Sequence, residues 1–259
     1  VMGFRRYRKR VNHPHLHALA IGHYASKHIR LFNDRIWRWG YFVEMNTQPP
    51  ALVQDRPLRL LWVGRMLSWK RVDLLLRAVA RLRSFDRFGG CTIVGDGPEK
   101  NRLKRLVERL GLGPDQIKFL PPVPFDEVRR LMRHSDVYVL PSDRREGWGA
   151  VAGEAFSEGC VLVANEQAGA ARELIDHGYT GYLFKNGNVT QLASILDRLA
   201  GNFQERMEVR MNAWQRGNEL WHPQVAAKRL VALYRGLLGV ETLPEYLSGP
   251  CARLTWPTL

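Results

Sequence analysis

The stretch DVYVLPSDRREGWGAVAGE, residues 136–154, joins an apolar run to a glycine-flanked turn and then to a series of small residues. The run predicts a buried strand, and the small residues after the turn predict a helix. Glu146 lies in the turn and Glu154 about two helical turns later, so both carboxylates can face the carboxyl end of the strand. Open α/β sheets bind ligands there, and a carboxylate accepts two hydrogen bonds from a sugar or ribose diol. The plain alternative is a loop glutamate followed by a solvated helix glutamate.

Outward from this stretch, short apolar runs alternate with amphipathic segments. The predicted strands are 58–64, 91–95, 117–121, 137–141, 160–165 and 180–184. The predicted helices between them are 72–82, 100–112, 125–135, 149–159 and 170–178. This alternation predicts right-handed βαβ units and therefore an α/β fold with a doubly wound, parallel, six-stranded (Rossmann-like) sheet covered on both faces.

The first fifty residues do not follow the same alternation. They contain a predicted strand at 16–22, a short helix at 24–32 and a strand at 37–43. One such fragment cannot form a core of its own, so residues 1–43 are interpreted as the remnant of a preceding domain. Residues 44–57 are then a proline-containing linker, 58–220 the main domain, and 221–259 a C-terminal helix and tail. The last twenty residues, with three prolines, are predicted to be irregular.

The composition narrows the class of protein and its partners. Thirty-nine basic against 25 acidic residues give a net charge of +14, which favours anionic partners. The three cysteines are far apart, and no apolar run has the roughly 18 residues of a membrane span, so a cytoplasmic protein without disulfides is expected. The basic segment FRRYRKR (4–10) is either a solvated face or a patch for phosphate or an anionic membrane surface. No stacking motif or zinc-finger spacing indicates nucleic acid.

Two loops that follow predicted strands carry residues suited to phosphates. In VGRMLSWKR, Gly64 permits close approach of the backbone, while Arg65 and Lys70 can hold a diphosphate without a metal ion. Taken singly, either cation is better explained as a surface charge, whereas its position at the carboxyl end of a parallel strand favours the phosphate role. In VGDGPEK, Gly95 begins a sharp turn that, by itself, is better explained as a structural connection.

Two predicted helix starts are also suited to an anion or a polar ligand. One follows Gly147 and Gly149, and the other follows Gly169 and Ala170 in NEQAGAARE, with Glu173 inside the helix. Backbone N–H groups and the helix dipole favour negative charge at such positions.

Other constellations are absent or weak. His13, His15 and His17 alternate, but no carboxylate or cysteine accompanies them, so no metal site is predicted. The sequence has no Gly-x-Ser-x-Gly elbow, no His-Glu-x-x-His and no phosphate loop ending in Gly-Lys-Ser/Thr. A dinucleotide fingerprint is also missing after the first strand of the main domain, which argues against a dehydrogenase.

These motifs together resemble the donor half of the retaining family 4 glycosyltransferases of GT-B fold. The resemblance runs from about Leu58 to Ala200 and is carried by VGRMLSWKR, IVGDGPEKNRLKRL, VYVLPSDRREGWGAVAGEAFSEG and AARELIDHGYTGYLF. Trp148 replaces the commoner phenylalanine, and AGAARE departs from the usual Gly-Gly-x-x-Glu, so Glu173 is carried over less firmly. The family has an acceptor domain before the linker, where this sequence has about fifty residues.

The resemblance implies a role for each matching residue. Arg65 and Lys70 would hold the donor diphosphate, Glu146 would contact the transferred sugar, and Glu154 would bind the ribose hydroxyls. The nucleotide and sugar would also be lined by the backbone of Gly64, Gly95, Gly147, Trp148 and Gly149. It further implies transfer with retention of configuration, by front-face displacement, with no cofactor and no metal ion.

Three hypotheses follow. The leading one is the donor-binding portion of a glycosyltransferase that moves a sugar from a nucleotide-diphosphate sugar to a saccharide or lipid-linked acceptor. Its acceptor domain would come from upstream sequence or a partner chain, and the protein would contact the inner face of an anionic membrane peripherally. The alternative is a catalytically silent nucleotide-sugar-binding subunit that needs or regulates a partner. The third is a different Rossmann-like nucleotide enzyme.

Overall fold

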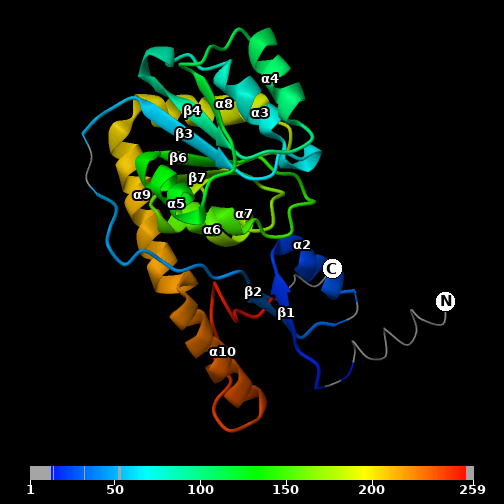
Figure 1. Cartoon of the computed structure of the whole chain (residues 1–259). Coiled ribbons are helices and arrows are strands. Elements are labelled where there is room, and N and C mark those ends of the chain that lie inside the picture. Colours follow the sequence, from blue (N-terminus) through cyan, green and yellow to red (C-terminus); the bar gives the residue numbers. More distant parts are fainter. Residues whose placement is uncertain (1–12, 14, 32, 52–53, 255–259) are drawn as a thin grey trace, which may run out of the picture.

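The computed structural model describes residues 13, 15–31, 33–51 and 54–254 and contains a large and a small parallel sheet (Figure 1). The large sheet has six strands in the order β5-β4-β3-β6-β7-β8. Its strands are β3 (Leu58–Val63), β4 (Phe88–Val94), β5 (Ile117–Leu120), β6 (Val137–Leu140), β7 (Val161–Asn165) and β8 (Gly181–Phe184). The predicted six-stranded parallel sheet is therefore confirmed.

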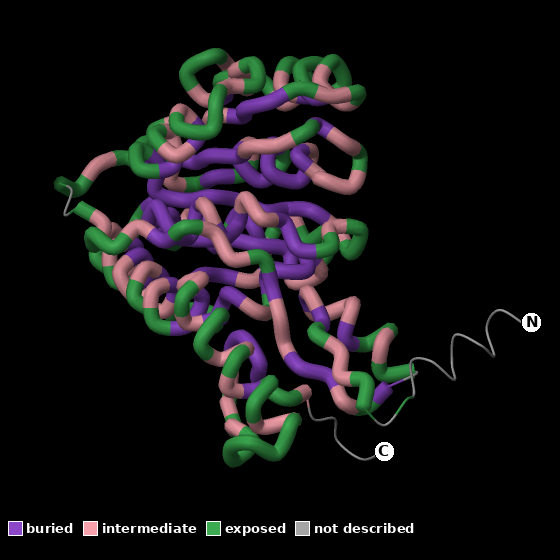
Figure 2. Tube along the Cα trace, turned by 60° about the horizontal axis from the view of Figure 1, so that its bottom comes forward, coloured by how far each residue is buried: buried purple, intermediate pink, exposed green. Residues whose placement is uncertain are grey.

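Helices cover both faces of the large sheet. The helices of this part are α3 (Val72–Val79), α4 (Lys100–Arg109), α5 (Phe125–His134), α6 (Ala150–Ser157), α7 (Ala171–Leu174), α8 (Val189–Gly201) and α9 (Phe203–Arg216). One hydrophobic core lies between the sheet and α3, α4 and α8, and a second lies under α5, α6 and α7. Between these two layers β3, β6, β7 and β8 are buried along most of their length, while β4 and the edge strand β5 are less buried (Figure 2).

Two helices differ from the sequence-based prediction. α8 was not predicted, although its buried Leu192, Leu196 and Leu199 have helical spacing. α7 is a single turn rather than the predicted nine residues, because the chain turns away after Leu174. The N–H of Asp176 donates to Thr180 Oγ1 at 2.9 Å instead of to a helix carbonyl.

The first segment forms the small sheet. Its strands β1 (Ala18–Ile21) and β2 (Ile36–Trp39) run parallel and are joined by α2 (His23–Ile29). The strand predicted at 37–43 was wrong beyond Trp39. A side chain at Gly40 would lie 2.5 Å from the Trp148 ring, so the chain leaves the sheet there and passes along the large domain. His17 has a structural contact, since its Nδ1 accepts from Trp37 Nε1 at 3.3 Å.

The described part of the C-terminal tail is irregular, as predicted, apart from an isolated antiparallel bridge that pairs it with β2. The N–H of Arg38 donates to the Ala252 carbonyl at 2.8 Å, and the N–H of Leu254 donates to the Ile36 carbonyl at 3.0 Å. Trp37 packs with Leu233 of α10 (Pro223–Leu237) and with Cys251 in a third core. The small core of the first segment therefore depends on residues about two hundred positions later.

The two sheets are connected twice. Through the linker, the N–H of Asn46 donates to Ser157 Oγ at 2.8 Å, while the Asn46 carbonyl accepts from Trp214 Nε1 at 2.7 Å. Through the C-terminal part, the π-helical turn Gly217–Trp221 joins α9 to α10, and this path runs from the large sheet to the small one (Figure 1).

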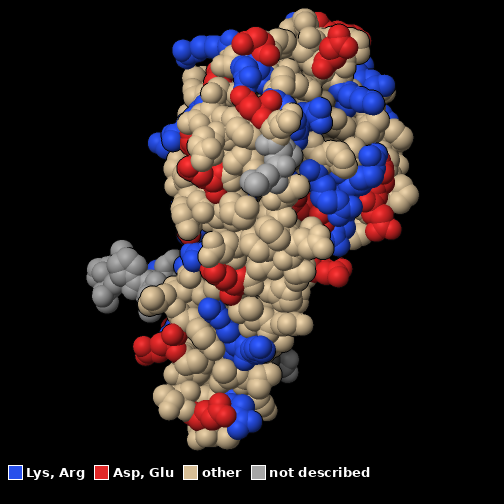
Figure 3. Space-filling view, turned by 90° about the vertical axis from the view of Figure 1, so that its left-hand side faces the viewer, with Lys and Arg blue, Asp and Glu red and all other residues tan. Residues whose placement is uncertain are grey.

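The surface charge is mixed on the face shown in Figure 3. Lys and Arg side chains alternate there with Asp and Glu over the large domain instead of forming one continuous basic surface. The basic segment 4–10 lies outside the described residues, so its expected role stays a prediction. Within the described part of the chain, no helix combines the length and the apolar character needed to cross a membrane.

Candidate functional site

The strand order reverses between β3 and β6, which places a topological switch point at the centre of the large sheet. From β3 the chain proceeds outward to β4 and β5, and from β6 it proceeds the other way to β7 and β8. β3 and β6 pair directly through Leu60–Val137 and Leu61–Tyr138. The loops after these two strands therefore diverge at their carboxyl ends, where doubly wound sheets bind ligands.

An ion pair bridges the two loops. Lys70 Nζ, in the 3₁₀ turn Ser68–Lys70 after β3, contacts the carboxylate of Glu146 in the loop after β6. Both side chains are largely buried, with 19% and 12% of their area exposed. The N–H of Asp143 donates to the Trp69 carbonyl at 2.9 Å, which fixes the loops against each other. The structure thus brings two residues predicted separately into direct contact.

A cavity of ≈530 Å³ opens above this pair. Seven of the nine predicted site residues line it: Gly64, Lys70, Glu146, Gly147, Trp148, Gly149 and Glu154. The remaining two, Arg65 and Gly95, line a second cavity of ≈560 Å³. The two cavities share Val63, Gly64 and Val128, so they form one continuous cleft at the switch point.

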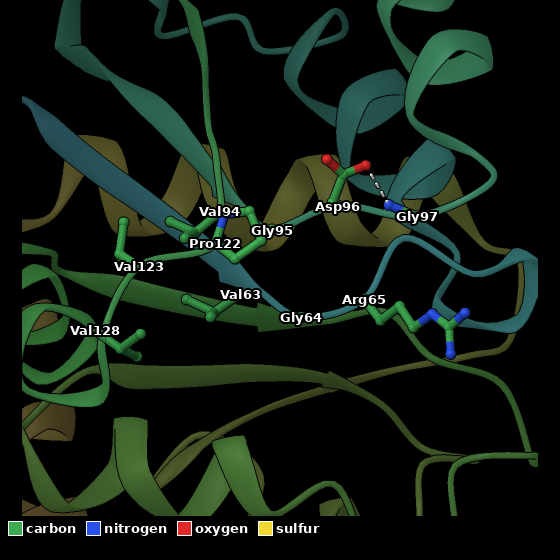
Figure 4. Close-up of a pocket in the computed structure, with 10 residues that line it drawn as sticks. All are labelled: Val63, Gly64, Arg65, Val94, Gly95, Asp96, Gly97, Pro122, Val123 and Val128. Carbon is green, nitrogen blue, oxygen red and sulfur yellow. Dashed lines mark hydrogen bonds between the residues drawn. The ribbon is translucent and has the colours of Figure 1, made fainter.

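The second cavity is mostly apolar at its inner end. Val63, Val94, Pro122, Val123 and Val128 lie together there, and Arg65 extends away from them at the outer end (Figure 4). The carboxylate of Asp96 accepts from the N–H of Gly97 at 2.7 Å, as the dashed line in Figure 4 marks. This cavity can therefore hold a flat apolar group at one end and an anion at the other.

Two glycines are required by the local geometry. Gly149 precedes α6 with a φ of 85°, and a Cβ there would lie 3.3 Å from Glu146 Cγ. Gly95 has a φ of 130°, and a Cβ there would lie 2.0 Å from the Gly64 carbonyl oxygen. Gly95 thus lets the ends of β3 and β4 approach each other, a structural reason that is independent of any nucleotide.

The N-terminus of α6 opens onto the first cavity. Gly149, Ala150 and Val151 line that cavity, and their N–H groups donate no hydrogen bond to another part of the described chain. The first N–H groups of a helix have no partner within the helix, and together with the helix dipole they favour an anion.

Glu154 differs from Glu146 in its surroundings. Its carboxylate makes no hydrogen bond or ion pair with any described residue. Burial raises the pKa of Glu154, and the charge of Arg129 offsets part of that rise. A carboxylate without partners at the wall of a cavity is suited to accept hydrogen bonds from a ligand that enters.

The loop before α7 does not join the site as predicted. The N–H of Gly169 donates to the Glu146 carbonyl at 3.0 Å, and the N–H of Ala170 donates to the Trp148 carbonyl at 3.0 Å. Glu173 lines neither cavity, because Arg38 of β2 holds its carboxylate at 2.7 Å. The expectation that these N–H groups face a ligand was wrong. They hold the two loops together instead.

Trp148 contributes to the site through its backbone, since its indole is buried. The ring packs edge-on against Tyr41 and lies 5.7 Å from the Trp221 ring. Two exposed aromatic residues of the first cavity, Tyr41 and Phe125, were not among the predicted site residues. Neither lies in a motif: Tyr41 falls in a run that was interpreted as a strand, and Phe125 begins a predicted helix. Within the described ranges, no group of His, Cys, Asp or Glu side chains is arranged to hold a metal ion.

A doubly wound sheet with a two-part cleft at its switch point defines a Rossmann-like α/β protein with room for an extended ligand. Residues 45–216 match the family model described as Glycosyl transferases group 1. Because the match covers more than half of the chain, this protein belongs to that family.

Two curated relatives illustrate the family. The amylovoran biosynthesis glycosyltransferase AmsK of Erwinia amylovora is 28% identical over 190 residues, which cover 70% of this chain and 46% of the relative. A D-inositol 3-phosphate glycosyltransferase of Thermomonospora curvata is 31% identical over 187 residues, which cover 68% and 42%. The chain thus spans under half the length of either relative.

Solved structures share the fold. A variant of S. aureus TarM, crystallised with fondaparinux, alpha-GlcNAc-glycerol and UDP, has a TM-score of 0.72 at 19% identity, covering 84% of this chain and 43% of TarM. HepE from Anabaena, in complex with UDP, has a TM-score of 0.67 at 23% identity, covering 83% and 64%. These likenesses confirm the predicted fold class, a Rossmann-like sheet of GT-B type.

Proposed function

We propose that this chain binds a nucleotide-diphosphate sugar and forms the donor half of a retaining glycosyltransferase that needs no metal ion. The observation that supports this proposal most directly is the contact between Lys70 and Glu146 in a two-part cleft at the switch point. The presence of UDP in the TarM variant and HepE structures supports a nucleoside diphosphate as the ligand class.

The cleft suggests how such a donor would lie. The base would occupy the apolar end of the cavity near Val123, and the ribose hydroxyls would donate to Glu154. The diphosphate would lie near the N-terminus of α6, where Arg65 and Lys70 supply the positive charge. Lys70 would then exchange its contact with Glu146 for one with phosphate, which frees Glu146 to accept hydrogen bonds from the sugar.

The transfer step would use the same groups. The bond between the anomeric carbon and the diphosphate oxygen breaks while the acceptor hydroxyl oxygen attacks the same face, which retains the configuration. The leaving diphosphate oxygen accepts the proton of that hydroxyl. Lys70, Arg65 and the N–H groups of α6 would stabilise the negative charge that grows on the diphosphate, as preorganised donors do in a site closed to water.

The acceptor side and the location of the protein belong to the same proposal. The acceptor would be a saccharide or a lipid-linked saccharide, bound where a domain from upstream sequence or a partner chain closes over the cleft. The setting would be the cytoplasm, with peripheral contact to the inner, anionic face of the membrane.

Calorimetric titration of the chain with UDP, GDP and ADP, with EDTA present, tests donor binding. We expect at least one of them to bind, and Arg65→Ala to weaken that binding by about tenfold to a hundredfold, because a charge-assisted contact of ~1.5–3 kcal/mol is lost. Arg59→Ala is the matched control, since Arg59 lies near the opposite end of the same strand, outside the proposed cleft. Absence of binding by all three nucleotides would contradict the proposal.

A further inference from the structure

Two exposed aromatic side chains line the cavity above Lys70 and Glu146. Tyr41 and Phe125 both line this cavity, and each has 55% of its area exposed. They come from distant parts of the chain: Tyr41 follows β2 of the small sheet, and Phe125 is the first residue of α5. Two large apolar rings exposed beside charged groups call for a ligand that has both apolar and polar surface.

The position of Tyr41 is fixed by buried neighbours. Gly40 lies against the Trp148 ring so closely that a Cβ would be 2.5 Å from Cη2. The Tyr41 ring itself meets Trp148 edge-on, with ring centroids 6.4 Å apart. Trp148 is in turn buried against Trp221. A ring held in this way loses little conformational freedom when a ligand stacks on it.

Phe125 is positioned by α5, which also contributes to the second cavity. It begins α5, whose Val128 is shared by both cavities, and the Arg129 guanidinium lies 6.0 Å from the centre of its ring. Its position is therefore tied to the wall of the donor cleft, whereas that of Tyr41 is tied to the small sheet.

We infer that Tyr41 and Phe125 form a platform that binds the pyranose ring of a saccharide acceptor by stacking. A pyranose has a flat face of C–H groups, which packs on aromatic rings, and hydroxyl groups at its edge, which hydrogen-bond to carboxylates. The cavity offers both surfaces, since it also contains Glu146, whose two carboxylate oxygens can accept from the donor sugar and from the bound pyranose. This inference rests on the proposed function, because the bound ring would present its hydroxyl to the donor sugar.

A lipid chain suits this opening less well. A prenyl chain would need a continuous apolar groove, whereas the cavity that Tyr41 and Phe125 line is also lined by the charged Lys70, Glu146 and Glu154. Any lipid portion of the acceptor would therefore lie outside the cavity, with the sugar stacked on the platform.

Saturation-transfer NMR of the purified chain with methyl α-D-glucopyranoside, methyl α-D-mannopyranoside and geranyl phosphate tests the platform. We expect saturation of the pyranose C–H protons of at least one glycoside. Tyr41→Ala should lower the affinity for that glycoside by about threefold to tenfold, the size of one lost ring contact, and Tyr41→Phe should leave the affinity unchanged. Tyr234→Ala is the matched control, because Tyr234 lies on α10, has 61% of its area exposed and lines neither cavity.

The outcomes separate this inference from the proposed function. If UDP, GDP or ADP binds but neither glycoside does, or if Tyr41→Ala binds a glycoside as the wild type does, the platform is wrong while donor binding stands. If geranyl phosphate binds and the glycosides do not, the opening serves a lipid and the inference is also wrong. Glycoside binding that depends on Tyr41 without any nucleotide binding would keep the platform and overturn the proposed function.

Discussion

At the scale of single residues, the two glutamates of EGWGAVAGE have different environments although they lie in one cavity. Glu146 contacts Lys70, while Glu154 has no partner among the described residues and a pKa raised by burial. An ion pair can exchange partners when a ligand enters, whereas a carboxylate without partners gains its hydrogen bonds only from the ligand. This difference supports separate roles for the two side chains.

Substitutions at the two positions should therefore affect nucleotide binding differently. Glu154→Gln should lower the affinity for the nucleoside diphosphate by about tenfold, because the neutral amide accepts weaker hydrogen bonds than the carboxylate. Glu146→Gln should not weaken it, because the change removes a negative charge beside Lys70, and only recognition of the sugar should suffer. Calorimetry with the free diphosphate and with the corresponding nucleotide sugar checks both. Equal losses of diphosphate affinity in the two variants would refute the assignment.

The raised pKa of Glu154 also predicts a pH effect on stability. A carboxyl whose pKa is higher in the folded chain than the ordinary 4.5 is protonated more readily when folded, so its contribution to stability falls as the pH rises above 4.5. Glu154→Gln should therefore unfold at a higher temperature than the wild type at pH 7, and the difference should shrink as the pH falls toward 4.5. Thermal unfolding followed by circular dichroism at each pH gives the unfolding temperatures of the variant and the wild type. Glu108→Gln, on the exposed side of α4, is the control. A variant that melts lower than the wild type at pH 7 would contradict the account.

At the scale of elements, the cleft depends on how closely the ends of β3 and β4 approach. Gly95→Ala should lower the free energy of unfolding by about 2 kcal/mol or more, because it combines a left-handed φ with overlap on the Gly64 carbonyl. Urea unfolding gives this value. Gly201→Ala, at the end of α8 with nothing within 4 Å of the added Cβ, should leave stability unchanged or raise it by up to about 0.5 kcal/mol. Similar effects of the two substitutions would show that the close approach is not needed.

The strands of the large sheet were predictable because each is a short apolar run next to a turn signal, and because parallel strands buried on both faces have no polar alternation to confuse the pattern. The contact between Lys70 and Glu146 could be predicted only in part. The positions of the strand ends predict that the two loops meet, but not which atoms are in contact. Tyr41 could not be predicted, since its place depends on the packing of Gly40 against Trp148, 108 positions later in the chain. The pairing of the tail with β2 has the same cause, a long-range contact between segments that carry no local signal.

At the scale of the whole molecule, the small sheet links the beginning and the end of the described chain. β2 has β1 on one side and the tail near Arg253 on the other, while β1 pairs with β2 alone in the described part. One edge of β1 therefore presents unpaired backbone groups, which other strands can use. Leu16 and Leu19, just before β1 and within it, are exposed, as is Leu31 after α2, and Val231 and Tyr234 of α10 and its C-cap residue Leu238 are exposed as well.

These surfaces and the position of the cleft predict what the chain does by itself. A transferase must hold the acceptor hydroxyl against the donor and exclude water, and in the proposed function the small sheet and the Tyr41 segment would form the described part of the acceptor side. We therefore expect the purified chain to self-associate, measured by sedimentation velocity. With radiolabelled nucleotide sugars and saccharide or lipid-linked acceptors, we expect no glycosyl transfer until an acceptor domain is supplied as upstream sequence or as a second chain. The supplied domain should also suppress self-association, because it would cover β1 and the adjoining leucines. Rapid transfer by a monodisperse monomer would show instead that the small sheet and the two aromatic rings suffice for the acceptor, and the need for a second domain would be disproved.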